Sequence, residues 1–321
     1  MRKSVFFRLS AVWMTVSAVL TATCLIACGT NVGKNTVLEP VPEEFKERSL
    51  HPGTMERLQY QTWESFTYDE HSQGLEKEAW VYLPYGYTPD KRYNIFYISH
   101  GAWSDETTVM GTDGEPSGFK DVIDNAMDAG RISPMILVML TYNNTDDMDS
   151  WDTELSARLT EQFHNELMND LIPAVEERYS TYAEDTTPDK LRKSRDHRGF
   201  GGYSMGSVHT WCTFCNALDY FRYFMPISGG YTSDGRYMAE AVEKQGYTSK
   251  DFFIYALSGP DDFAYYALKD QLDAMGTVKD TFIDADTDKK GNYLFREMGG
   301  YEHGPEAADL FTYNGLRYFW N

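Results

Sequence analysis

Gly202-Tyr203-Ser204-Met205-Gly206 is the stretch of this sequence that decides its fold. It follows the pattern G-x-S-x-G, which is typical of a sharp turn between a strand and a helix. The serine hydroxyl then projects above the sheet, and the glycines let the two elements approach closely. The neighbouring residues agree, because residues 199–201 resemble a strand end and residues 207–218 predict a helix.

Strand and helix patterns alternate on both sides of this turn. Short, β-prone apolar runs are expected to be strands at residues 80–83, 95–98, 135–140, 200–203, 223–227, 252–257 and 293–295. Helical spacing occurs at residues 119–127, and apolar residues at every fourth position from Leu155 to Val175 predict one long helix. This alternation predicts the α/β class, with a mainly parallel central sheet that carries helices on both faces. Ligands of such sheets bind beyond the carboxyl ends of the strands.

The N-terminus carries an export pattern. Arg2, Lys3 and Arg8 form a positive region ahead of the uncharged, mostly apolar residues 9–27, which predicts a secretory signal peptide over residues 1–27. The stretch ends in Leu25-Ile26-Ala27-Cys28, which resembles the lipobox of bacterial lipoproteins, so Cys28 is expected to be lipidated. The alternative is an uncleaved membrane anchor, because about 20 apolar residues span a bilayer. Both interpretations predict an extracytoplasmic, membrane-tethered domain at the bacterial cell surface or envelope.

Residues 28–55 are rich in Asn, Pro, Glu and Thr and show no sustained periodicity, so they are expected to form a linker. Residues 56–321 are expected to form a single domain, a length that suits one α/β core. The formal net charge of the whole chain is −20, and the predicted signal peptide contains no acidic residue. Such a charge excludes nucleic acid as a partner but leaves uncharged polysaccharide possible.

A serine hydroxyl becomes a nucleophile when a base and an orienting acid accompany it. In proteins with this turn the partners follow in the order Ser, acid, His. His209 lies on the predicted helix and is expected to point away from the turn, so His303, in a glycine-rich loop, is the predicted base. Asp261 and Asp262 both follow the predicted strand at residues 252–257, and either could orient His303.

When such a serine attacks a carbonyl carbon, the carbonyl oxygen becomes an oxyanion, and two backbone N–H groups are predicted to stabilise it. Met205 directly follows the serine, and Ala102 follows the strand that is expected to end at Ser99. Trp103 and Trp151 fall in loops expected near the turn that carries the serine and are candidates for substrate binding, with burial in the core as an equal alternative for each.

No metal or organic cofactor is expected. Asp284-x-Asp286-x-Asp288 begins like a calcium loop but lacks the glycine and the glutamate that the loop requires further on. Cys212 and Cys215 have C-x-x-C spacing, but they fall in the helix after Ser204 and have no second pair beside them. We therefore predict that they pack in the core rather than serve redox chemistry or bind metal.

Six short motifs make the chain similar to carbohydrate esterase family 1, the esterase D-like group of feruloyl and acetylxylan esterases in the α/β-hydrolase superfamily. They are Val81-Tyr82-Leu83-Pro84, Gly86-Tyr87, Ser99-His100-Gly101, Leu171-Ile172-Pro173, Gly202-Tyr203-Ser204-Met205-Gly206 and Gly299-Gly300-Tyr301-Glu302-His303. In that family the acid is the third residue after a strand-end glycine, here Gly259, so the resemblance implies a triad of Ser204, Asp262 and His303. Tyr301-Glu302 before the histidine departs from the family spacing, which makes Tyr301 a candidate for the acyl pocket.

The resemblance implies a serine esterase that hydrolyses feruloyl or acetyl esters on plant cell-wall polysaccharide such as xylan. Its expected partners are an ester-bearing polysaccharide or oligosaccharide and, through the lipid anchor, a membrane. One alternative is an acyltransferase that passes the acyl group to a sugar instead of water. The other is a catalytically silent polysaccharide-binding domain, which the intact order of serine, aspartate and histidine disfavours.

Overall fold

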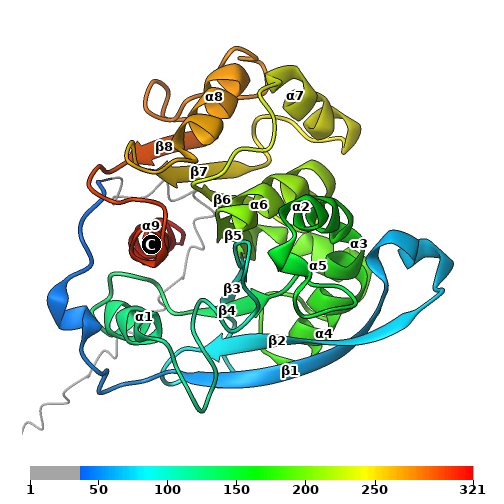
Figure 1. The fold of residues 1–321 in the computed structure, drawn as a ribbon. Helices are drawn as coiled ribbons and strands as arrows, with labels where there is room; N and C mark the ends of the chain where they lie inside the picture. The colour runs from blue at the N-terminus through cyan, green and yellow to red at the C-terminus, as the bar shows by residue number, and fades with distance from the viewer. Residues whose placement is uncertain (1–36, 321) are drawn as a thin grey trace, which may run out of the picture. The chain divides into compact units, whose positions relative to one another are not determined.

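The computed structural model of the protein describes residues 37–320. Within them, eight strands form one sheet in the order β1-β2-β4-β3-β5-β6-β7-β8 (Figure 1). The strands are β1 (Thr54–Trp63), β2 (Gly74–Leu83), β3 (Asn94–Ser99), β4 (Met135–Leu140), β5 (Arg198–Tyr203), β6 (Tyr223–Ile227), β7 (Phe253–Ser258) and β8 (Tyr293–Glu297). The pairs β1–β2 and β2–β4 are antiparallel and the others are parallel, which confirms the expected α/β fold with a mainly parallel sheet.

Helices cover both faces of this sheet (Figure 1). One face carries α1 (Gly118–Asp128) and α9 (Pro305–Leu316), which pack in one hydrophobic cluster with the strands. The opposite face carries α2 (Thr153–Gln162), α3 (His164–Glu166), α4 (Ile172–Arg178), α5 (Pro188–Lys193), α6 (Met205–Asn216), α7 (Gly235–Lys244) and α8 (Tyr265–Gly276). Short 3₁₀ helices span Glu43–Lys46, Ser65–Glu70, Asp149–Trp151 and Arg195–His197. Because both faces are covered, β4 is buried along its whole length.

The long helix expected between Leu155 and Val175 is not one regular α-helix. A π-helical turn, Leu167–Leu171, separates α3 from α4. An α-helix has 3.6 residues per turn, so side chains spaced by four drift around its surface, and a wider π turn brings them back. The apolar stripe therefore stays on the sheet side at Leu159, Phe163, Leu167, Leu171 and Val175, which are all buried.

Residues 37–55, the described part of the expected linker, pack against the domain, and the last two already belong to β1. Phe45 is buried beside α1 and α9, and the Gly53 N–H donates to Asp124 Oδ1 at 2.8 Å. The Tyr313 hydroxyl donates to Glu39 Oε1 at 2.9 Å. The described part of the expected linker is thus held by apolar contacts and hydrogen bonds, which its polar composition concealed.

The predicted signal peptide, with Cys28, lies outside the described residues. Within residues 37–320, the helices are all too short or too polar to cross a lipid bilayer.

Candidate active site

Ser204 lies at the turn between β5 and α6 with φ 61° and ψ −117°, a conformation that non-glycine residues rarely adopt. The turn is held in place, since the Ser204 N–H donates to the Ile227 carbonyl at 2.9 Å. A Cβ atom at Gly202 would lie 2.5 Å from the Ser99 carbonyl oxygen, and one at Gly206 only 2.3 Å from it. Both glycines are therefore required by the close approach of α6 and β5 to the end of β3.

His303 comes from the loop between β8 and α9 and connects the serine to an acid. Its Nε2 lies 2.9 Å from Ser204 Oγ, and its Nδ1 lies 2.7 Å from Asp262 Oδ1. Burial raises the pKa of Asp262, but hydrogen bonds from His303 and from the Ala264 N–H outweigh it, so the pKa is lowered overall. An ionised Asp262 requires a proton on Nδ1, which leaves Nε2 free to accept the serine proton.

The two adjacent aspartates have different partners. Asp262 is buried and contacts His303, whereas Asp261 is exposed and its Oδ2 accepts the Gly300 N–H at 2.6 Å. Asp261 thus holds the loop that carries the histidine, and Asp262 holds the histidine itself.

Tyr203 is a residue of this site that the sequence did not single out. Its hydroxyl donates to Asp262 Oδ2 at 3.1 Å and accepts the Gly304 N–H at 3.0 Å. Its ring centroid lies 4.6 Å from that of His303. Tyr203 therefore positions both the acid and the histidine loop, and its place inside the G-x-S-x-G pattern was the available signal.

The loop after β3 is held so that the Ala102 N–H has a fixed direction. The Gly101 carbonyl accepts hydrogen bonds from His100 Nδ1 at 2.7 Å and from the Tyr142 hydroxyl at 2.8 Å. This carbonyl and the Ala102 N–H belong to one planar trans peptide, so they point in opposite directions. A Cβ atom at Gly101 would lie 3.6 Å from Ser204 Cβ, which places the loop against the serine.

Two further residues of this region are His100, which follows β3, and Met205, which follows the serine. His100 is buried, and burial lowers its pKa to about 4, so the ring is neutral at pH 7. Met205 is the first residue of α6, and N–H groups of a first helical turn have no acceptor within their own helix. The Met205 N–H is therefore available beside the serine that precedes it.

Trp103 and Trp151 are exposed by 60% and 57%, so neither is a core residue. Their loops lie side by side, because the Trp103 N–H donates to the Ser150 carbonyl at 2.9 Å. Buried Asn143 links the same loops, because its Oδ1 accepts the Ser150 N–H at 2.9 Å and its Nδ2 donates to the Ser104 carbonyl at 3.4 Å. Tyr301 is half-buried and lines a separate hollow of about 650 Å³ together with residues of α1 and α9.

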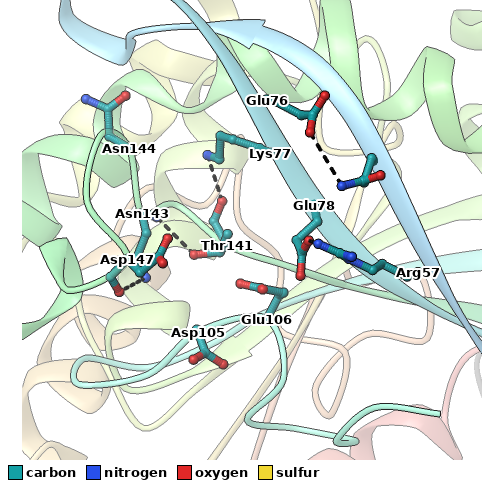
Figure 2. A pocket seen from close by; sticks show the side chains of 11 residues that line it. Arg57, Glu76, Lys77, Glu78, Asp105, Glu106, Thr141, Asn143, Asn144 and Asp147 are labelled. Carbon is teal, nitrogen blue, oxygen red and sulfur yellow. Dashed lines mark hydrogen bonds and ion pairs between the residues drawn. The ribbon is translucent and has the colours of Figure 1, made fainter. Parts of the chain in front are cut away.

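A polar cavity of about 390 Å³ lies beside the loops that follow β3 and β4 (Figure 2). It is lined by Asp105 and Glu106, which follow β3, and by Asp147, which follows β4. Arg57 of β1 and Glu78 of β2 line it as well. Burial raises the pKa of Glu106 to about 7. In the part of the chain that the structure describes, no group of three or more His, Cys, Asp or Glu residues is arranged to hold a metal ion.

His209, Cys212 and Cys215 lie on α6, where the first two are buried and Cys215 is partly buried. His209 is fully buried with its Nδ1 2.8 Å from Ser99 Oγ, and its ring contacts Phe163 and Phe200. Cys212 and Cys215 are free thiols on α6, and burial raises the pKa of both, that of Cys215 to about 12. Neither thiol has the lowered pKa that reactive cysteines show.

Comparison with known proteins identifies related sequences. The family model described as "Putative esterase" matches residues 71–266. Endo-1,4-beta-xylanase Y of Acetivibrio thermocellus is 36% identical over 247 residues, which are 75% of this chain and 22% of that protein. An endo-1,4-beta-xylanase/feruloyl esterase of Xylanibacter ruminicola is 30% identical over 182 residues, which are 55% of this chain and 22% of that protein. The chain thus spans about a fifth of the length of these curated relatives.

Solved structures share the fold. A mutant of the feruloyl esterase module from Clostridium thermocellum, complexed with sinapinate, is 33% identical with a TM-score of 0.74, covering 88% of this chain and 94% of that one. A ferulic acid esterase from Anaeromyces mucronatus is 17% identical with a TM-score of 0.62, covering 88% of this chain and 97% of that one. The second likeness concerns the fold alone.

Proposed function

The chain belongs to the esterase family within carbohydrate esterase family 1 of the α/β-hydrolase superfamily, and from this premise we propose that it is a serine esterase with Ser204 as its nucleophile. The observation that carries the proposal is the chain of contacts from Ser204 Oγ to His303 at 2.9 Å and from His303 to Asp262 at 2.7 Å. These distances are within the range for proton transfer along hydrogen bonds.

In the proposed mechanism, Ser204 Oγ attacks the ester carbonyl carbon while its proton passes to His303 Nε2. Asp262 stabilises the resulting imidazolium, and the N–H groups of Ala102 and Met205 stabilise the oxyanion. His303 then gives the proton to the leaving alcohol oxygen as the carbon–oxygen bond breaks, which leaves an acyl-serine. Water, deprotonated by His303, attacks the acyl carbon, and the acid departs as the proton returns to Ser204 Oγ.

We propose feruloyl or acetyl esters on xylan-type polysaccharide as the substrates. The names of the relatives, which include a xylanase/feruloyl esterase and a feruloyl esterase module bound to sinapinate, support this substrate class. Exposed Trp103 and Trp151, which lie on adjoining loops, offer aromatic surface to a sugar or an aromatic acyl group. The strongly acidic chain favours a neutral polymer over an anionic one.

A hydrolysis panel tests the proposal. Methyl ferulate, acetylated xylan and short and long nitrophenyl esters are incubated with wild type and with Ser204→Ala, and we expect methyl ferulate to be hydrolysed by wild type alone. Hydrolysis of acetylated xylan in preference to methyl ferulate would assign the acetyl group instead. If wild type hydrolyses none of the panel, the esterase proposal fails, and the polysaccharide-binding domain takes its place.

The acyltransferase alternative uses the same residues up to the acyl-serine. Adding an excess of a sugar acceptor distinguishes the two, because a transferase forms a new sugar ester whereas an esterase still releases free acid.

We also propose that the protein is a lipid-anchored envelope protein, with Cys28 as the lipidated residue. The support for this is the lipobox-like sequence Leu25-Ile26-Ala27-Cys28 after an apolar stretch.

A further inference from the structure

The proposed chemistry determines where the alcohol part of the ester lies. As the carbon–oxygen bond breaks, His303 Nε2 gives its proton to the alcohol oxygen, so this oxygen must come within hydrogen-bond distance of Nε2, about 3 Å. The carbonyl oxygen, in contrast, faces the N–H groups of Ala102 and Met205. On a polysaccharide ester, the sugar ring that carries the acyl group therefore stands next to the imidazole of His303.

Within residues 37–320, two aromatic rings contact this imidazole. The Tyr203 ring is half-buried, and its hydroxyl already binds Asp262 and the Gly304 N–H. The Phe263 ring has its centroid 4.2 Å from that of His303, at 34° between the ring planes, and Phe263 is 79% exposed. Of the two rings, Phe263 is therefore the one that a ligand at His303 can reach.

The backbone on both sides of Phe263 is held by Asp262. The Asp262 N–H donates to the Gly259 carbonyl at 3.0 Å, and the Ala264 N–H donates to Asp262 Oδ1 at 2.8 Å. The Tyr265 N–H donates to the Asp262 carbonyl at 3.0 Å, where α8 begins. A phenyl ring on such a fixed turn loses little conformational entropy when a ligand binds, because only two side-chain torsions remain free.

A sugar is a suitable occupant of this place. A pyranose presents C–H groups on the faces of its ring, and these pack against an aromatic ring while the hydroxyls at its edge remain in water. An exposed phenyl group on its own needs no explanation. Phe263, however, is exposed while it is in direct contact with the proposed base, the group next to which the leaving alcohol must come.

We infer that Phe263 forms the subsite for the sugar ring whose hydroxyl carries the acyl group. The inference rests on the proposed esterase function and adds to it a residue that discriminates the alcohol part of the substrate. Phe263 then contributes to hydrolysis of sugar esters and has little effect on esters of a small alcohol, which is too short to reach the phenyl face.

The test compares two substrates with the same acyl group, a feruloylated xylan oligosaccharide and methyl ferulate. For Phe263→Ala we expect kcat/KM on the oligosaccharide to fall about 3- to 10-fold, mainly through a higher KM, which is the size of one aromatic contact. On methyl ferulate we expect a change of less than about twofold. Phe263→Trp restores the aromatic face and should restore activity on the oligosaccharide, and Tyr266→Ala, which removes an exposed aromatic residue of α8, serves as the control.

Equal losses on both substrates in Phe263→Ala would overturn the inference, because Phe263 would then only support the position of His303. Unchanged activity on the oligosaccharide would overturn it as well. If wild type hydrolyses neither ester, the proposed esterase function fails instead, so the two failures are distinguishable.

Discussion

At the scale of the residue, Asp261 and Asp262 show that a shift of one position in the sequence changes the hydrogen-bond partner of a carboxylate. From the local sequence either carboxylate could orient His303, and only the family spacing from Gly259 favours Asp262. In the structure Asp262 contacts His303, and Asp261 holds the Gly300 N–H. The local pattern could not decide between them, because the direction of each side chain depends on how the turn after β7 is closed.

Asp262→Asn is expected to reduce kcat on methyl ferulate by roughly 10⁴-fold, because the imidazole loses the carboxylate that sets its tautomer and stabilises its charge. Asp261→Asn should cost much less, since an asparagine oxygen can still accept the Gly300 N–H. Steady-state kinetics of both variants, alongside circular dichroism to check folding, measure this. The reverse order of the two effects would contradict the geometry.

At the scale of the element, the sequence predicts best those strands whose residues are apolar because both faces of the sheet are buried. The central strands appear as apolar runs because helices cover both sides of the sheet, and the strand-to-helix turn at Ser204 is encoded by its own glycines. The sequence analysis did not identify β1, because only one of its faces is buried and it lacks the continuous apolar run of the central strands. The sequence cannot decide whether Trp103 and Trp151 are exposed, because their exposure depends on contacts between two loops far apart in the sequence.

Gly206→Ala tests the close approach of α6 to β3. The new Cβ atom would lie 2.3 Å from the Ser99 carbonyl oxygen, so the helix must shift, and we expect the melting temperature to fall by roughly 5 °C. Activity should fall with it, because α6 carries Met205. Gly118→Ala is the matched control, since nothing lies within 4 Å of its added Cβ atom and it should melt like wild type. Equal melting of the two variants would contradict the packing described.

At the scale of the whole molecule, loops from five strands meet at one edge of the sheet. Ser204 follows β5, Asp262 follows β7 and His303 follows β8, whereas Ala102 and Trp151 follow β3 and β4. Because the carboxyl ends of parallel strands lie along one edge, residues up to 101 positions apart in the sequence form hydrogen bonds there. The fold class alone predicted this edge as the location of the site.

We expect Glu106 to make the stability of the molecule depend on pH. Its pKa is raised by burial to about 7 in the folded protein, so between pH 4.5 and 7 the folded state keeps a proton that the unfolded state has lost. In wild type, the contribution of Glu106 to the free energy of unfolding is present below about pH 4.5 and is lost as the pH rises through about 7. In Glu106→Gln the fall in melting temperature from pH 5 to pH 8 should be smaller by a few degrees.

The control for this measurement is Glu115→Gln, which removes the same charge from an exposed loop position. Its melting temperature should depend on pH as that of wild type does. Equal pH dependence of Glu106→Gln and wild type would show that Glu106 is not the group responsible.

The anchor proposal concerns the cellular location of the whole molecule. Wild type expressed with residues 1–27 should partition with membranes and carry lipid on Cys28, because the cysteine follows a lipobox-like sequence. Cys28→Ala should lose the lipid. Mass spectrometry of the mature N-terminus measures this, and a mature chain that still begins at Met1 would contradict cleavage.

The hydrolysis of methyl ferulate by Ser204→Ala tests the central claim most directly. Alanine keeps Cβ in the strained turn and removes only the hydroxyl, so the melting temperature should stay within a few degrees of wild type while kcat falls by roughly 10⁴-fold or more. His303→Ala should lose a similar factor, and the double variant should be little worse, because the two groups act as one unit. Near wild-type turnover by a folded Ser204→Ala would contradict the account.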